Sequence, residues 1–218
     1  MNYAHERGER RQGRTPTKPV VLPPLSTAHW PHMRAYLRKR GLSPPLAEVN
    51  GWYPTLDRYS TPRIVIPAQS LLNTWPYYQA RAMDDNPKRY DSPSAPRGDA
   101  LVVCYPDLKD MDHVVVVEGP MDALAAAECG YVGIALMGNT PSDEVLRHID
   151  DIALPYAGLT VLSDIDATNE AVEVVHRLWT AGRRATFRPI HGYKDLAEVP
   201  LEKRQAIIED TVDKCTRN

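Results

Sequence analysis

The second half of the chain contains hydrophobic segments separated by polar ones. Their patterns predict strands and helices in turn. The run from Val114 to Val117 is continuous and β-branched, which is typical of a strand buried on both faces. Further strands are expected at 132–136, 159–162 and 185–189, and helices at 120–129, 142–151, 168–181 and 201–215. Because strand and helix alternate throughout, the pattern predicts an α/β fold whose parallel sheet carries helices on both faces.

The first half has a different pattern, made of one amphipathic helix and several short strands. Ser26 or Thr27 can cap a helix that runs to Arg40, because Met33 and Leu37 continue an apolar face at helical spacing. Short strands are expected at 63–67, 75–83 and 101–105, with a loop rich in Pro, Ser and Asp at 84–99. Residues 1–24 lack apolar periodicity and are rich in Arg, Gly and Pro, which is typical of a disordered arm.

These patterns divide the chain into four predicted segments. They are a disordered basic arm at 1–24, a small basic α+β subdomain at 25–110, an α/β domain at 111–200 and a C-terminal helix at 201–218. None of the histidines joins a recognisable site, and His113 and His148 are expected at the surface or at a sheet edge.

Charge separates the two halves of the chain. Residues 1–110 carry 16 Lys or Arg against 10 Asp or Glu, whereas residues 111–218 carry 10 against 18. The basic half could hold phosphates and the acidic half a divalent metal, although solvated surfaces explain the charge equally well.

No apolar run approaches the roughly 20 residues of a membrane span, and the polar N-terminus is not a secretory signal. Three widely spaced cysteines without a C-x-x-C pair argue against a structural zinc site within the sequence and favour a reducing cytoplasm.

Carboxylates gather where the predicted strands end. Glu118 directly follows the strand at 114–117, and Asp164 and Asp166 follow the strand at 159–162. Sites in open α/β sheets lie at these carboxyl ends, and two carboxylates that point to one place repel each other unless a cation lies between them. Oxygen ligands of this kind suit Mg²⁺ or Mn²⁺. Asp122 can approach the same site or complement the helix dipole, and Asp195 follows the fourth strand.

Several motifs together resemble a known family. The stretch Val-Val-Glu118-Gly-Pro-Met-Asp122, followed by Ala-Leu-Met-Gly138 and Ser-Asp164-Ile-Asp166, resembles the Toprim fold of primases, topoisomerases and related nucleases. Upstream, Ala-Tyr-Leu-Arg-Lys-Arg-Gly at 35–41, Arg-Ile-Val-Ile-Pro at 63–67, Gln-Ala-Arg at 79–81 and Pro-Lys-Arg-Tyr-Asp-Ser-Pro at 87–93 are similar to motifs of DnaG-type bacterial and phage primases. The resemblance covers about residues 26–200.

This resemblance implies a Toprim (Rossmann-like) parallel sheet and a nucleotidyltransferase that synthesises short RNA primers in phage or mobile-element DNA replication. Glu118, Asp164 and Asp166 would be catalytic metal ligands, with Asp122 and Asp195 as additional ligands for Mg²⁺ or Mn²⁺. A basic groove would hold template, nascent strand or nucleotide phosphates. The residues expected in that groove are Arg38, Arg40, Arg63, Arg81, Lys88, Arg89 and Lys194.

The same resemblance implies partners and leaves alternatives open. The partners would be single-stranded DNA, nucleoside triphosphates, and a replicative helicase or a separate zinc-module protein, because the sequence has no Cys framework of its own. Ile165 stands where the family commonly has glycine between the two aspartates. A metal-dependent Toprim nuclease, which would activate water with the same carboxylates, is one alternative. A non-catalytic nucleic-acid-binding accessory of replication is the other.

Overall fold

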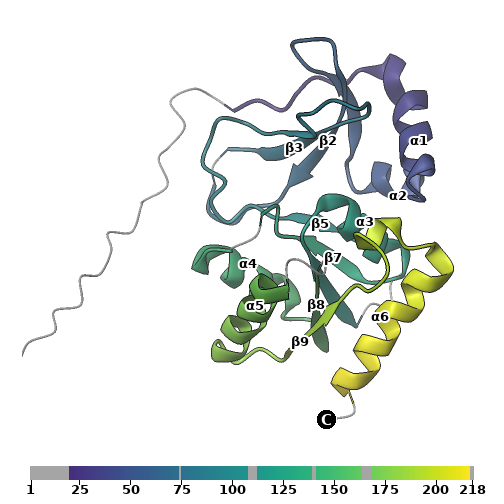
Figure 1. Ribbon diagram of the computed structural model, residues 1–218. Coiled ribbons are helices and arrows are strands. Elements are labelled where there is room, and N and C mark those ends of the chain that lie inside the picture. The colour runs from purple at the N-terminus through teal and green to yellow at the C-terminus, as the bar shows by residue number, and fades with distance from the viewer. Residues whose placement is uncertain (1–19, 74, 108–111, 139–140, 164–167, 217–218) are drawn as a thin grey trace, which may run out of the picture.

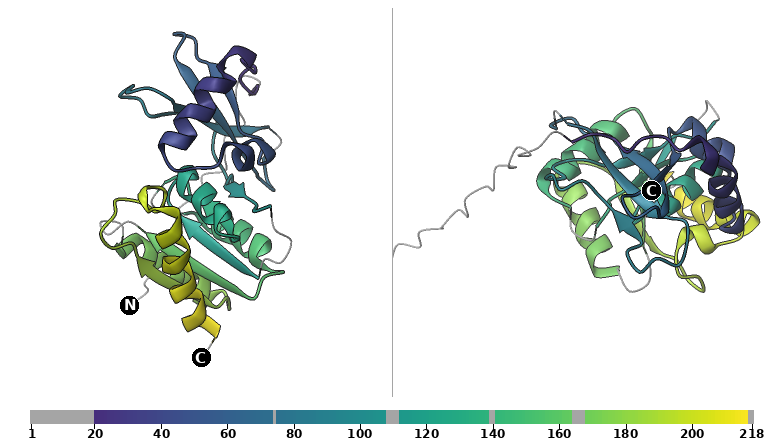
Figure 2. Two further views of the ribbon diagram at one scale, coloured as in Figure 1. Left: turned by 90° about the vertical axis from the view of Figure 1, so that its right-hand side faces the viewer. Right: turned by 90° about the horizontal axis from the view of Figure 1, so that it is seen from above.

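The computed structural model describes residues 20–73, 75–107, 112–138, 141–163 and 168–216, the last six by backbone alone. Figure 1 shows an N-terminal part built on an antiparallel sheet, which packs on one end of a larger α/β part. The C-terminal helix runs along the α/β part and begins close to the junction (Figures 1 and 2).

The N-terminal part combines two helices with a four-stranded antiparallel sheet of order β1-β2-β3-β4. A 3₁₀ turn, η1, precedes the first helix, and Ser26 Oγ hydrogen-bonds His29 Nδ1 at 2.7 Å across it. Met33 and Leu37 are fully buried on α1, as their spacing predicts. The elements are η1 (Thr27–His29), α1 (Trp30–Lys39), α2 (Pro44–Val49), β1 (Tyr53–Leu56), β2 (Pro62–Ala68), β3 (Tyr77–Ala82) and β4 (Tyr90–Asp91).

The α/β part has a five-stranded sheet of order β5-β7-β6-β8-β9, in which β5 alone is antiparallel to its neighbour. Its elements are β5 (Val102–Cys104), β6 (His113–Val117), α3 (Pro120–Glu128), β7 (Val132–Ala135), α4 (Asp143–Ala153), β8 (Gly158–Ser163), α5 (Thr168–Thr180), β9 (Ala185–Pro189), η3 (Leu196–Glu198) and α6 (Leu201–Thr216). Within the described residues, no helix has both the length and the apolar character that crossing a membrane requires.

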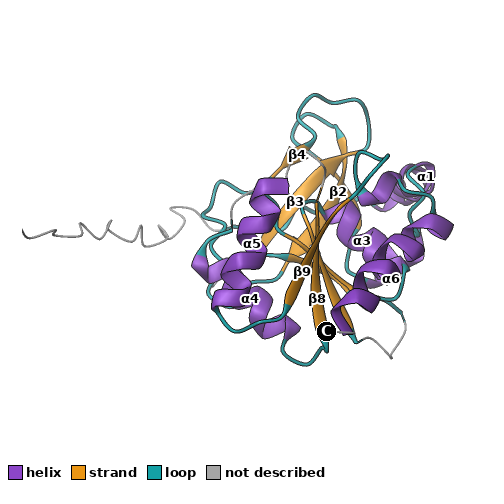
Figure 3. Ribbon diagram, turned by 60° about the horizontal axis from the view of Figure 1, so that its bottom comes forward, coloured by secondary structure: helices purple, strands orange, loops and turns teal. Residues whose placement is uncertain are grey.

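Two hydrophobic cores lie on the two faces of this sheet. Figure 3 shows α4 and α5 on one face and α3 and α6 on the other. The core under α4 and α5 is confined to the α/β part. The core under α3 continues into the N-terminal part, where it includes Met33, Trp52 and Ile64. Because the two parts share this buried apolar core, they pack against each other and are not independent domains joined by a flexible linker.

The α/β fold class predicted from the sequence is confirmed, and the architecture is consistent with a Toprim-like fold. One boundary differs from the prediction. Segment 101–105 was expected in the basic subdomain, but β5 pairs with β7 and so belongs to the second sheet. Every residue of β5 is buried. An apolar strand of three residues carries no periodicity that tells which sheet it joins.

The end of the predicted disordered arm is held against the first sheet. Tyr53 Oη donates to the carbonyl of Pro23 at 2.8 Å, and Thr55 Oγ1 donates to that of Pro24 at 2.7 Å. The backbone NH of Ser26 donates to Pro54 O at 2.9 Å. Residues 23–26 therefore run beside β1, and the expectation of disorder is wrong for this end of the arm. Residues 1–19 lie outside the described residues.

Two histidines expected near the surface are buried instead. His113 is 2% exposed at the start of the central strand β6, and His148 is 3% exposed on α4. His113 Nε2 hydrogen-bonds Thr160 Oγ1 at 2.9 Å, and its ring fills the space beside Gly158, where a Cβ would lie 2.4 Å from the ring. Burial lowers the pKa of His113 to about 4. The ring is therefore neutral in the folded protein at neutral pH.

We expect this histidine to make folding stability depend on pH. The unfolded chain protonates His113 near its ordinary pKa of 6.5, whereas the folded chain resists protonation until about pH 4. The free energy of unfolding should therefore fall as pH drops through that window, by up to about 3 kcal/mol from this residue. Urea unfolding of wild type and His113→Gln between pH 7 and 4 measures the difference. His176→Gln, at an exposed position of α5, is the control and should keep the wild-type slope.

Candidate metal and nucleic-acid site

Glu118 lies where the sequence places it, directly after β6 at the carboxyl edge of the parallel sheet. Its side chain is exposed, and its backbone carbonyl accepts a hydrogen bond from Met137 NH at 3.0 Å. Strand β8 runs parallel beside β6, with Val116 opposite Val161. The last residue of β8, Ser163, consequently reaches the same edge, and it lines a small cavity of about 30 Å³ together with Glu118 and Glu170.

Asp164 and Asp166 lie outside the described residues, as does Ile165 between them. They directly follow Ser163, whose Oγ is buried and has no hydrogen-bond partner among the described residues. Across the part of the chain that the structure describes, no three His, Cys, Asp or Glu side chains gather as a metal site. A metal at this edge therefore depends on Asp164 and Asp166 joining Glu118, and that combination remains a prediction.

Asp122 and Asp195 both support the short helix η3. Asp122 is 9% exposed in the first turn of α3, and its Oδ1 accepts a hydrogen bond from Ala197 NH at 2.9 Å. Asp195 caps η3 by accepting from Glu198 NH at 2.9 Å, and its other oxygen lies 3.8 Å from Arg40 Nη2. Each carboxylate therefore has a role in the fold, and the predicted metal contacts of both remain predictions.

A groove of about 1360 Å³ runs between α1, the turn from β3 to β4, and segment 194–204. It brings together basic residues that are far apart in the sequence. Acidic side chains, among them Asp84 and Asp85, share its walls, so its charge is mixed rather than uniformly positive. The basic residues that line it are Lys39, Arg40, Arg81, Arg89, Lys194 and Arg204, of which Arg40, Arg81, Arg89 and Lys194 are predicted from the sequence.

Two tyrosines hold Arg81 in this groove. Arg81 Nε donates to Tyr36 Oη at 3.0 Å, and its guanidinium lies 4.9 Å from the centre of the Tyr90 ring. Burial raises the pKa of Tyr90 to about 12, so its ring stays neutral at any ordinary pH. A guanidinium over a neutral aromatic face is stabilised by its attraction to the ring. Arg81 is thus pre-oriented by side chains from α1 and β4.

If this groove holds nucleic acid, as the sequence predicts, removing the Tyr36 hydroxyl should loosen Arg81 and weaken that binding. We expect Tyr36→Phe to lower the affinity for single-stranded DNA by about threefold to tenfold, the usual range for one net hydrogen bond. Fluorescence anisotropy of labelled DNA at fixed salt measures this affinity. Tyr59→Phe is the matched control, because Tyr59 is 74% exposed and does not line the groove. Equal affinities for Tyr36→Phe and wild type would show that Arg81 needs no support.

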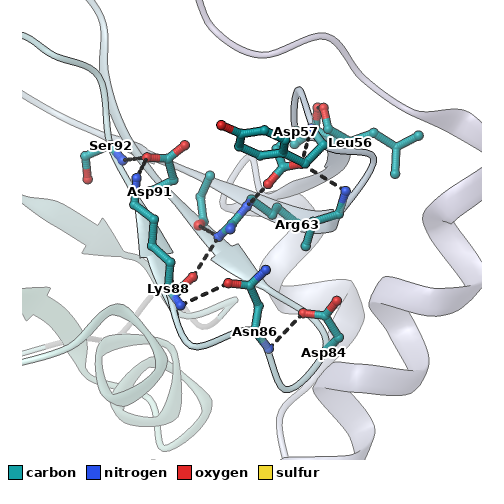
Figure 4. A network of polar contacts seen from close by, with 12 residues as sticks. Leu56, Asp57, Arg63, Asp84, Asn86, Lys88, Asp91 and Ser92 are labelled. Atoms are coloured by element: carbon teal, nitrogen blue, oxygen red, sulfur yellow. Dashed lines mark hydrogen bonds and ion pairs between the residues drawn. The ribbon is translucent and has the colours of Figure 1, made fainter.

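Arg63 departs from its predicted place in the groove. Its side chain is only 3% exposed, and its Nε donates to Asp57 Oδ2 at 2.8 Å. Nη1 donates to the carbonyls of Ala80 and Lys88 at 3.1 and 3.2 Å, so the guanidinium ties three segments together inside the first sheet (Figure 4). The structure therefore does not bring Arg63 into the groove, because these contacts hold its guanidinium inside the protein.

Lys88 and Arg38 are exposed but lie outside the groove. Lys88 makes an ion pair with Asp91, the residue that closes the same turn (Figure 4). Arg38 lines a separate, largely apolar hollow of about 550 Å³ beside Leu42, Leu46 and Val49. The structure therefore does not bring these two cations together with the other predicted phosphate-binding residues.

Tyr36, on α1, lines the groove but is not among the residues predicted from the sequence. Tyr36 lies four residues after His32 and three and four residues before Lys39 and Arg40, the spacings that bring side chains together on one face of a helix. That spacing was a usable signal for a polar face turned toward the groove. No comparable signal exists for Ser163, since a serine at the end of a strand is common.

Comparisons with known proteins identify the fold at low sequence identity. No protein-family model matches the sequence, and no curated protein matches it either. The structure resembles one chain of a structure described as bacteriophage T7 lagging-strand DNA polymerase interacting with primase domains of two gp4 subunits bound to an RNA/DNA hybrid and dTTP. That match has a TM-score of 0.59 and 18% identity, and it covers 81% of this chain and 89% of the other.

The second similar structure is the Aquifex aeolicus primase, comprising its zinc-binding and RNA polymerase domains. It gives a TM-score of 0.60 at 14% identity and covers 81% of this chain. This chain spans 55% of the length of the Aquifex chain. Both likenesses extend over most of the described residues, and at these identities they show that the fold is primase-like.

Proposed function

We propose that this chain is a primase-type nucleotidyltransferase core that synthesises short RNA primers on single-stranded DNA. The observation that carries the proposal is the extent of the structural likeness. It covers 81% of the chain against two primases, which is more than either sheet with its helices occupies alone. The order of the basic motifs and the Glu118 motif in the sequence supports the same conclusion independently.

In this proposal, Glu118, Asp164 and Asp166 hold Mg²⁺ or Mn²⁺, with Asp122 and Asp195 as additional candidate ligands. Carboxylate oxygens are the donors that these ions prefer, and Ser163 Oγ offers a buried, unpartnered oxygen at the same edge. When bound, the ion supplies positive charge that offsets the triphosphate and the developing charge of phosphoryl transfer. Glu118 and Ser163, which line one small cavity at the ends of β6 and β8, would help to hold such an ion at this edge.

The groove next to η3 supplies the surface for nucleic acid. Arg81, Arg89 and Lys194 approach it from three different segments, which lets them contact successive phosphates rather than one. Asp84 and Asp85 on the same walls limit the net positive charge. We therefore expect binding that is salt-dependent but weaker than that of a uniformly basic channel.

The proposal includes partners and setting. A complex with RNA/DNA hybrid and dTTP is described for the bacteriophage T7 primase domains, and the ligands proposed here are single-stranded DNA template and nucleoside triphosphates. A replicative helicase, a separate zinc-module protein or both would provide loading and template selection. The setting would be replication of a phage or mobile element in the bacterial cytoplasm.

The test is synthesis of labelled oligoribonucleotides on single-stranded DNA with four ribonucleoside triphosphates and Mg²⁺ or Mn²⁺. The wild type should yield short products, alone or with the helicase and zinc-module partners added, and Asp164→Ala should yield none. Absence of product under every one of these conditions would contradict the proposal. Metal-dependent shortening of the template strand would instead favour a nuclease.

A further inference from the structure

Arg97 links the N-terminal part of the chain to the edge where Glu118 lies. It belongs to the loop between β4 and β5, and its Nη1 donates two hydrogen bonds, to Leu136 O and Met137 O, both at 2.9 Å. These two carbonyls directly follow β7. An arginine nitrogen carries two hydrogens, so a single Nη1 can satisfy both acceptors.

The loop that carries Arg97 is itself firmly held. Asn73 Nδ2 donates to Arg97 O at 2.8 Å, and Gly98 has φ +59 with Asn73 Oδ1 only 2.6 Å from where its Cβ would be. Asp99 is 1% exposed and accepts a hydrogen bond from Leu71 NH at 2.8 Å. The base of the Arg97 side chain is therefore fixed by the turn at 70–73.

The backbone that Arg97 contacts is joined to Glu118. Leu136 NH donates to Val117 O at 2.9 Å, and Met137 NH donates to Glu118 O at 3.0 Å, so the β6–β7 pairing continues past both strands. Met137 has a positive φ of 54°, an uncommon conformation for a residue with a side chain. Gly138 has φ 151°, and a Cβ there would lie 3.2 Å from Arg97 Nη1. Unusual backbone of this kind persists only where its surroundings hold it.

We propose that Arg97 is a positioning residue, which fixes the end of β7 and through it the placement of Glu118 for metal binding. The inference rests on the proposed metal site of Glu118, Asp164 and Asp166. Arg97 touches neither metal nor substrate in this role. It acts through the two carbonyls that it holds, in the way that outer hydrogen bonds orient metal ligands.

The test measures Mn²⁺ binding by the full chain, from the electron paramagnetic resonance signal of free Mn²⁺, alongside the thermal midpoint of unfolding. Arg97→Ala should weaken Mn²⁺ binding by about tenfold or more, as loss of an outer support does in known metal sites. Arg97→Lys keeps the charge and one donor group and should restore part of the affinity. Arg147→Gln removes an arginine that is 70% exposed on α4 and should leave Mn²⁺ binding unchanged.

Gly138→Ala perturbs the same backbone segment after β7. A side chain at Gly138 is strained at this positive φ, and its Cβ would lie close to Arg97 Nη1. The substitution should weaken Mn²⁺ binding as well, and its effect should not add to that of Arg97→Ala because both act on one backbone segment. Mn²⁺ affinity equal to wild type in Arg97→Ala and Gly138→Ala would overturn the positioning role alone. A wild type that binds no Mn²⁺ would overturn the metal site and the role of Arg97 with it.

Discussion

Replacing Glu118 with glutamine should reduce nucleotidyl transfer by about 100-fold or more, the scale on which loss of one charge-stabilising group acts in an active site. Glutamine has nearly the same shape but lacks the negative charge that attracts a divalent cation. Glu118 is exposed at the end of β6, and its hydrogen bond to Met137 uses the backbone carbonyl. The substitution should therefore leave the fold intact.

The measurement is the initial rate of ribonucleotide incorporation at saturating Mg²⁺, with the thermal midpoint of unfolding recorded in parallel. Glu173→Gln on the exposed face of α5 is the matched control, since it removes the same charge away from the sheet edge. Its rate should equal that of the wild type. A Glu118→Gln protein with at least half of the wild-type rate would mean that this carboxylate does not serve the reaction.

Replacing Arg204 with methionine should destabilise the protein by about 3–5 kcal/mol, the usual cost of leaving one partner of a buried ion pair alone. Arg204 is 1% exposed on α6 and makes an ion pair with Glu128 on α3. Glu128 also accepts a hydrogen bond from the backbone NH of Ser43. Arg204 Nη2 donates to Val199 O at 3.0 Å and to Ala197 O at 3.3 Å.

This cluster is the point at which α6, α3 and the segment before α2 meet. Burial raises the pKa of Glu128, so the carboxylate depends on Arg204 to remain charged inside the protein. Without the arginine, Glu128 must either keep an unpaired buried charge or take up a proton. Either outcome lowers the free energy of unfolding, and the backbone carbonyls that Arg204 served lose their donors as well.

Urea unfolding at pH 7 measures the loss. Arg147→Met is the control, because the Arg147 ion pair with Glu144 is largely exposed and such pairs contribute only about 0–1 kcal/mol. The loss of unfolding free energy in the double variant Glu128→Gln with Arg204→Met should be smaller than the sum of the losses in the two single variants. The reason is that each single variant already breaks the ion pair, so the second substitution removes no further interaction between the two residues. Additive effects would argue against a coupled pair.

The sequence predicts most of the α/β part because its pattern is local and regular. The run Val114–Val117 is the core of β6, and the predicted helices after β6, β7 and β8 correspond to α3, α4 and α5. Helix α2 and strand β1 had no such signal. Pro44 and Pro45 open α2, which has only six residues, and β1 has four, so neither is long enough to show a period.

The position of Glu118 at a strand end also follows from the sequence, whereas the direction of charged side chains does not. Arg63 belongs to a family-like motif, yet its contacts with Asp57 and two carbonyls turn it inward. Its partner Asp57 is six residues away across the β1–β2 turn, and only the antiparallel register brings them together. The approach of Arg97 to β7 likewise depends on how the two parts pack.

The most direct test of the central claim is extension of an RNA oligonucleotide annealed to single-stranded DNA, with Mn²⁺ and one ribonucleoside triphosphate at a time. This format separates nucleotidyl transfer from initiation, which is the step for which partners would be needed. We predict that the wild type adds only the nucleotide complementary to the next template base, and that Asp164→Ala adds none. Addition of all four nucleotides alike, or no extension with any of them, would contradict the account.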